Sequence, residues 1–65
     1  SNLPSLSERE YACISLYQKG FTAKQTAREL GLSHRTIEDY FETIKMKYNV
    51  SNKRELLNPL FISRS

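Results

Sequence analysis

The apolar residues of this chain recur at helical spacing, with polar residues between them. Ile37, Phe41, Ile44 and Tyr48 follow an i, i+4, i+7, i+11 pattern, which predicts an amphipathic helix with one stripe facing a core. A shorter stripe of the same kind comes earlier in the chain and contains Leu6, Cys13, Ile14 and Tyr17. Alternating strand patterns are absent from these segments, so the sequence predicts an all-α fold.

Capping residues mark where the helices should begin and end. The capping-box spacing, Ser, Thr or Asn followed three residues later by Glu or Gln, occurs at Ser7–Glu10, Thr22–Gln25 and Asn52–Glu55, and Ser33 is the expected cap of a further helix. These signals predict a compact domain of four helices: from Ser7 to a stop at Lys19–Gly20, from Thr22 to Leu30 before Gly31, from about His34 to Tyr48, and from Asn52 to Asn58, with Leu56 and Leu57 on the fourth. The break at Asn58 is expected because a residue before proline avoids the helical region.

The length and composition allow one small domain, residues 1–65, and exclude several classes of function. A single cysteine and a single histidine cannot form an intrachain disulfide or a zinc site, so no metal is expected. Unpaired cysteine also favours a reducing compartment, the cytoplasm. No apolar run approaches the length of a membrane span. The signatures of catalysis are missing too, and we expect no enzyme, no cofactor and no small-molecule ligand.

The spacing of Ala27, Gly31 and Ile37 is typical of a helix-turn-helix. A small residue lets the second helix approach the first, a glycine takes the positive φ of the tight turn, and a β-branched residue packs the second helix back. The motif is predicted at about residues 23–42, with Leu30 and Phe41 adding apolar contacts on the inner side.

A wider set of residues at matching spacing extends this motif over most of the chain: Leu6-Ser7, Arg9-Glu10, Gly20, Lys24, Ala27, Leu30 to Ser33, Thr36-Ile37, Ile44, Lys47, Val50 and Glu55-Leu56. Together they resemble the LuxR/GerE-type DNA-binding domain found at the C-terminus of FixJ-like response regulators and quorum-sensing regulators. The resemblance covers about residues 6–57. It implies a transcription regulator domain whose third helix enters the major groove of double-stranded DNA and whose fourth often supports a homodimer. It also implies a sensory or receiver domain, for which 65 residues leave no room.

The chain departs from the family pattern at several positions. Thr26 stands where an aliphatic residue is usual, Tyr40 where histidine is frequent, and Tyr48 where leucine is usual. Glu38 and Glu42 stand where many members have basic or amide residues. The last two put acidic groups on the helix that the resemblance assigns to DNA.

The outer face of that helix is predicted to carry Arg35, Asp39, Glu42 and Met46, flanked by Glu38 and Thr43. We take Arg35, Glu38, Asp39 and Glu42 as candidate base-reading residues. A carboxylate can accept a hydrogen bond from a cytosine amino group. Alternatively, pairs of Arg35 with Asp39 and Glu38 hold the guanidinium ready for a base or a phosphate. A solvated polar face without a role is a third interpretation.

Candidate phosphate-contacting residues lie near helix N-termini or beside the third helix: Thr22, Lys24, Ser33, His34, Thr36, Lys45 and Lys47. Helix N-termini attract anions through free N–H groups, and short hydroxyl side chains there commonly reach phosphate oxygens. For Ser33 and Thr36 the assignment is also implied by the family resemblance. Thr22 and Ser33 are required as caps in any case, and surface lysines are ordinary.

Two functions from different classes remain open. The chain either binds double-stranded DNA, or is a protein-interaction module that contacts RNA polymerase or another regulator domain through its acidic third helix. Only DNA binding should weaken steeply with salt. An apolar end, formed by Leu57, Leu60, Phe61 and Ile62, is expected either to pair with a second copy or to fold back on the core.

Overall fold

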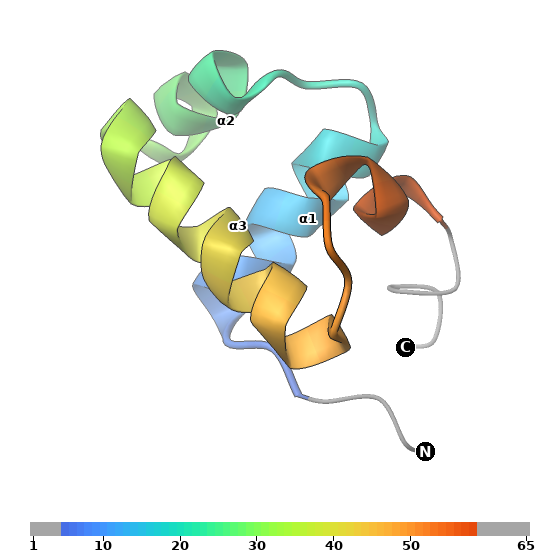
Figure 1. Cartoon of the computed structure of the whole chain (residues 1–65). Helices are drawn as coiled ribbons and strands as arrows, with labels where there is room; N and C mark the ends of the chain where they lie inside the picture. The colour runs from blue at the N-terminus through green and yellow to red at the C-terminus, as the bar shows by residue number, and fades with distance from the viewer. Residues whose placement is uncertain (1–4, 59–65) are drawn as a thin grey trace.

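A computed structural model describes residues 5–58 of the chain. Three α-helices follow one another: α1 (Glu8–Gln18), α2 (Ala23–Leu30) and α3 (His34–Tyr48). A short 3₁₀ helix, η1 (Lys53–Leu57), follows α3 (Figure 1). No strand occurs in the described part of the chain, so the predicted all-α fold is confirmed.

The predicted fourth helix is wrong in type: η1 is a single 3₁₀ segment, not an α-helix. The available stretch is short, and its bonds span three residues, with the Asn58 N–H donating to the Glu55 carbonyl at 3.2 Å. Asn58 is extended, with φ −65° and ψ 123°, as expected for a residue that precedes proline. The remaining residues of the predicted apolar end, Leu60, Phe61 and Ile62, lie outside the described residues.

The predicted N-caps are confirmed at all four elements. At α1 and α2 the capping box is complete: the hydroxyls of Ser7 and Thr22 accept from the N–H groups of Glu10 and Gln25, whose side chains accept from the cap backbone in return. At η1 the Asn52 side chain accepts from the Glu55 N–H, but the Glu55 carboxylate bonds the Asn52 side-chain amide at 3.3 Å, not the backbone. The third capping box is therefore incomplete.

The C-terminal ends of α2 and α3 close in the same way, around a left-handed residue. Gly31 has φ 69°, and the following N–H of Leu32 donates back to the Ala27 carbonyl at 2.9 Å. Asn49 has φ 57°, and the N–H of Val50 donates to the Lys45 carbonyl at 3.0 Å. This pattern satisfies carbonyls that a helix end otherwise leaves unpaired, and asparagine replaces glycine at the second site.

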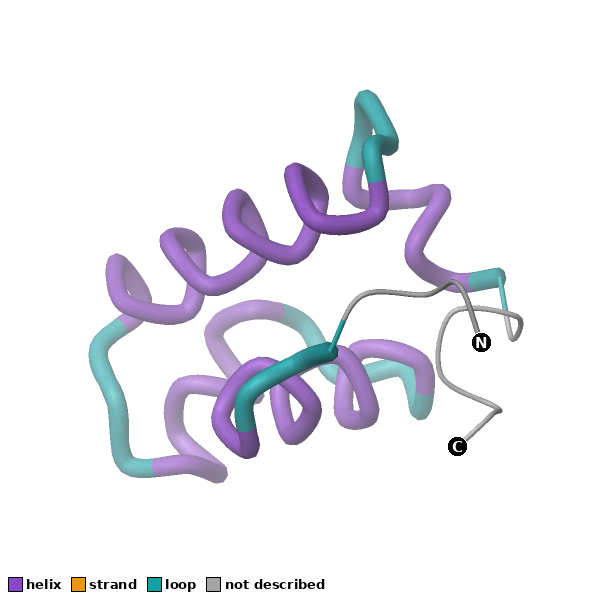
Figure 2. Tube along the Cα trace, turned by 90° about the horizontal axis from the view of Figure 1, so that it is seen from below, coloured by secondary structure: helices purple, strands orange, loops and turns teal. Residues whose placement is uncertain are grey.

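The core lies where α1 and α2 pack on one side of α3 (Figure 2). Its buried apolar members come from all four elements: Cys13 and Ile14, Ala23 and Ala27, Ile37, Phe41 and Ile44, and Leu56. The predicted stripe on α3 is thus confirmed, with Tyr48 at its partly buried edge. Because α1 and α2 cover one side of α3, the opposite side is left to solvent.

Two side chains, those of Gln18 and Lys53, make long-range contacts that hold η1 against the helices. The Gln18 amide donates to the carbonyls of Leu56 and Asn58, at 2.6 and 3.0 Å. The Lys53 ammonium lies 4.9 Å from the centre of the Phe41 ring and 5.4 Å from that of Tyr17, within the range of cation–π attraction. These contacts compensate for the small apolar surface of a five-residue segment.

Candidate nucleic-acid interface

The second and third helices form the predicted helix-turn-helix, joined by residues 31–33 (Figure 1). Ala27 and Ile37 are both buried between the two helices, and Gly31 takes the left-handed conformation that the spacing required. Leu30 and Leu32 pack against the same core from its edge. The motif therefore fixes the orientation of α3 relative to the N-terminus of α2.

The outer face of α3 is a continuous exposed surface, turned away from α1 and α2 (Figure 2). The side chains of Arg35 and Asp39 are 85% and 67% exposed, and Glu42 is similarly open. Met46 continues the same face one turn further, and Glu38 lies at its edge. The structure thus brings the four candidate base-reading residues together on one side of one helix.

Each acidic residue of this face has a basic partner on α3 itself. Arg35 Nε lies 3.4 Å from Asp39 Oδ1, which confirms the predicted pair. Glu38 lies beside His34 instead of Arg35, with 3.3 Å between His34 Nε2 and Glu38 Oε2. The third pair joins Lys45 Nζ to Glu42 Oε2, 3.0 Å apart. Exposed pairs of this kind contribute little stability and exchange readily. They lower the repulsion between the carboxylates and an approaching phosphate.

The candidate phosphate-contacting residues near the helix N-termini are exposed or half-buried. The Ser33 hydroxyl accepts from the Thr36 N–H at 3.0 Å and donates to the Thr36 hydroxyl at 2.9 Å. Thr22 is likewise occupied as a cap, accepting from the Gln25 N–H at 3.1 Å. Lys24 is exposed in the first turn of α2, beside the amides that attract anions.

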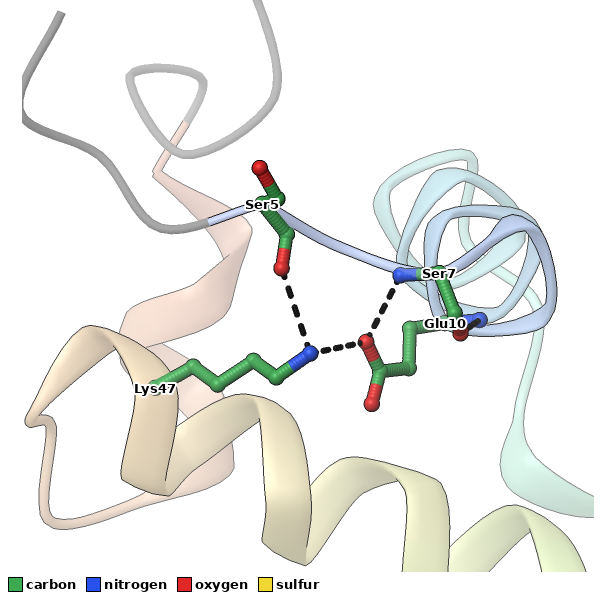
Figure 3. A network of polar contacts seen from close by, with 4 residues as sticks. All are labelled: Ser5, Ser7, Glu10 and Lys47. Carbon is green, nitrogen blue, oxygen red and sulfur yellow. Dashed lines mark hydrogen bonds and ion pairs between the residues drawn. The ribbon is translucent and has the colours of Figure 1, made fainter.

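Lys47 bonds a residue of another helix, whereas the ion pairs of His34 and Lys45 lie within α3. The Lys47 ammonium group lies 2.7 Å from Glu10 Oε1 and donates to the Ser5 carbonyl at 3.1 Å (Figure 3). Glu10 is buried, and its carboxylate also accepts from the Ser7 N–H at 2.8 Å. Burial raises the pKa of Glu10, but the bonds from Lys47 and Ser7 outweigh it and the pKa is lowered overall. The pair fastens the start of α1 to the last turn of α3.

The sequence did not reveal this bond, because Glu10 and Lys47 are far apart in the chain and each already had another assignment. The contacts of Gln18 and Lys53 were not predicted either, because their partners also lie far away in the chain. Met46 was placed on the right face, but its exposure of 79% follows only from the structure. Cys13 is buried as predicted, and burial raises its thiol pKa to about 11.

Other kinds of site find no support in the described residues. No group of three or more histidine, cysteine, aspartate or glutamate side chains could hold a metal ion there. No helix between residues 5 and 58 is long and apolar enough to cross a membrane.

The fold and the exposed helix define the class of protein as a helix-turn-helix domain. A family model described as bacterial regulatory proteins of the luxR family matches residues 4–58, and the chain belongs to that family. It is therefore a DNA-binding domain of transcription regulators and not an enzyme.

Comparison with curated proteins gives the same assignment. The chain is 31% identical over 52 residues to the HTH-type transcriptional regulator MalT of Vibrio campbellii, and 32% identical over 50 residues to that of Vibrio cholerae. These matches cover 80% and 77% of the chain but only 6% of each relative. The chain thus corresponds to a small part of those proteins. No solved structure matches it.

Proposed function

We propose that this domain binds double-stranded DNA in a sequence-specific manner, with α3 in the major groove. The observation that carries the proposal is the exposed face of α3, held by the helix-turn-helix on the side opposite the core. The major groove is about 12 Å wide and admits one helix. Arg35, Asp39 and Glu42 lie along the side that would enter it.

Positioning on the duplex is assigned to the residues near the N-termini of α2 and α3. Lys24 would contact a phosphate directly. The Thr22 hydroxyl can donate to a phosphate oxygen while it accepts from the Gln25 N–H, and the Thr36 hydroxyl can do so while it accepts from the Ser33 hydroxyl. The Ser33 hydroxyl would have to turn its proton from Thr36 to the phosphate. His34 and Lys45 flank the same approach. Both are paired with exposed carboxylates of α3, whereas Lys47 is bonded to the buried Glu10 on α1, so the proposal gives Lys47 the smallest part.

Recognition of bases is assigned to Arg35, Glu38, Asp39 and Glu42. A carboxylate released from its exposed pair can accept from the amino group of cytosine, and the freed Arg35 can donate to guanine. The three intrahelical pairs would thus exchange partners on binding. Net charge on α3 is zero, so this helix supplies selectivity more than attraction.

One such domain covers a single half-site, and we expect weak binding by a monomer. Two copies placed on half-sites about one helical turn apart should bind more tightly. The proposal includes a homodimer formed through η1, where Leu57 is exposed. It also includes a contact with RNA polymerase and a location in the cytoplasm, where bacterial DNA lies.

Selection from a random duplex library at low and physiological salt tests the proposal. Enrichment of one motif is the expected result, with affinity falling steeply as salt rises, because each neutralised phosphate adds about −0.9 to the slope of log K against log salt. Lys24→Ala should weaken binding to all sequences alike. It should also make the slope of log K against log salt shallower by about 0.9, the contribution of one phosphate contact. Arg9→Ala, at an exposed position in the first turn of α1 and outside both the motif and η1, is the matched control.

If no motif is enriched even at low salt, the other function takes its place. The acidic face of α3 would then be a surface for a protein partner.

A further inference from the structure

Met46 is the most exposed large apolar side chain in the described part of the chain, at 79%. The other exposed ones, Tyr11 on α1 at 48% and Leu57 on η1 at 44%, are less exposed and lie on other elements. Single exposed apolar residues are common on protein surfaces. The location of Met46, on the face of α3 proposed to enter DNA, is what gives it meaning.

Helix geometry places Met46 in line with the candidate base readers. It lies eleven residues after Arg35, seven after Asp39 and four after Glu42, which keeps all four within an arc of about 60° around the helix axis. Seven residues correspond to about 10 Å along the axis, or about three base pairs of duplex. Met46 would therefore meet the groove at one end of the half-site.

Met46 is suited to an apolar contact, unlike the charged side chains beside it on this face of α3. Its neighbours Lys45 and Lys47 are each held by a carboxylate, at 3.0 and 2.7 Å, and leave the thioether uncovered. The apolar group that the major groove offers is the C5 methyl of thymine. Three rotatable bonds let methionine reach across the widening gap between a straight helix and a curving groove.

We infer that Met46 is a specificity-determining residue that contacts the methyl group of a thymine at the edge of the half-site. The inference rests on the proposed function, since it requires α3 in the major groove. It adds an apolar contact to an otherwise polar recognition surface.

The test uses a duplex obtained by selection, with its thymines replaced one at a time by deoxyuridine. This change removes only the C5 methyl group. The wild-type chain should lose about fourfold in affinity at one position, the factor that burial of a single methyl group provides. Met46→Ala should bind the thymine and deoxyuridine duplexes equally, whereas Met46→Leu should restore the preference.

Tyr11→Ala removes an exposed apolar side chain outside α3 and serves as the control. Since Met46 is exposed, its variants should keep the helical circular dichroism of the wild type. Equal loss of affinity by Met46→Ala for all duplexes, or an unchanged preference for thymine, would overturn the inference while leaving the proposed function intact. Failure to select any motif would overturn the proposed function itself.

Discussion

Thr26 places a hydroxyl group in the core without a partner. The residue is fully buried on α2, and its Oγ1 atom has no hydrogen-bond partner in the described structure. Burial of an unpaired polar group costs about 1–3 kcal/mol. Thr26, at a position where the family usually has an aliphatic residue, therefore lowers the stability of the core and does not form a binding site.

Thr26→Val should raise the free energy of unfolding by about 1–2 kcal/mol, because it replaces the unpaired hydroxyl with a methyl group of the same shape. Urea titration monitored by circular dichroism measures the change. Thr43→Val, at an exposed position on α3, should change stability by less than about 0.5 kcal/mol. A loss of stability in Thr26→Val would mean that the hydroxyl is bonded after all.

Cys13 should behave as a core residue toward thiol reagents. Burial raises its pKa to about 11, so the native thiol is protonated near neutral pH and shielded from solvent. At pH 8 we expect modification at the rate of unfolding, and rapid modification once urea unfolds the chain. Rapid labelling of the native chain would contradict the buried position.

At the scale of the elements, the turn between α2 and α3 depends on a left-handed residue at Gly31. A valine there should destabilise the fold by about 1–2 kcal/mol, since a β-branched side chain resists positive φ. Nothing lies within 4 Å of the position of an added Cβ, so the cost comes from the backbone and not from a clash.

The ends of α2 and α3 supply the matched control. Asparagine occupies the equivalent left-handed position at Asn49, with φ 57°. Gly31→Asn should therefore cost clearly less than Gly31→Val, as measured by thermal unfolding. Equal losses in the two variants would point to crowding in the turn instead of backbone conformation.

The junction of α1 and α3 depends on the bond between Glu10 and Lys47. The lowered pKa of Glu10 means that its carboxylate stabilises the folded state near neutral pH, and this stabilisation is lost as the pH falls below the ordinary value of 4.5. Glu10→Gln should lower the free energy of unfolding by about 1–3 kcal/mol at pH 7. As the pH falls, this variant should then lose less stability than the wild type, because it no longer has this carboxylate to protonate.

The free energy of unfolding, measured from pH 7 to acid pH, distinguishes Glu10→Gln from a control variant, Glu8→Gln. Glu8→Gln changes an exposed carboxylate in the same turn of α1 and should keep the acid sensitivity of the wild type. If Glu10→Gln loses stability in parallel with the wild type as the pH falls, another carboxylate controls acid unfolding.

Local signals in the sequence predicted the elements well, because caps and apolar spacing act over a few residues. Ser7, Thr22, Ser33 and Asn52 all cap the elements that were expected to begin there. The nature of η1 was not predictable in this way. Its 3₁₀ geometry reflects a short segment between a cap and a proline, held by Gln18 from forty residues away.

The candidate interface was predictable only in part, because the sequence shows which residues share a helix face but not which residues of other elements they contact. Helical periodicity placed Arg35, Asp39 and Glu42 on one face, and the structure agrees. The partners of the charged groups depend on tertiary contact, so the sequence alone does not show that Lys47, a predicted phosphate contact, also bonds Glu10. The pairing of Glu38 with His34 was also not foreseen, since Arg35 offered an equally good spacing.

For the whole molecule, charge is divided between attraction and recognition. The chain carries a net charge of +3, but α3 contributes none of it because Arg35, Lys45 and Lys47 balance Glu38, Asp39 and Glu42. The net positive charge that attracts phosphates therefore comes from residues outside α3, such as Lys24, and sequence preference is assigned to the acidic outer face of α3. Substitutions in these two groups should therefore have different effects on DNA binding.

If the acidic face of α3 reads bases, Glu38→Gln should change which bases the domain selects. The substitution removes one negative charge and keeps the shape of the side chain. The measurement is duplex selection from a random library, performed in parallel with the wild-type and Glu38→Gln chains at the same salt concentration. We expect the selected motif to change at one base position while the others are retained. An unchanged motif that Glu38→Gln binds more tightly at every sequence would contradict this expectation, since Glu38 would then only repel phosphate.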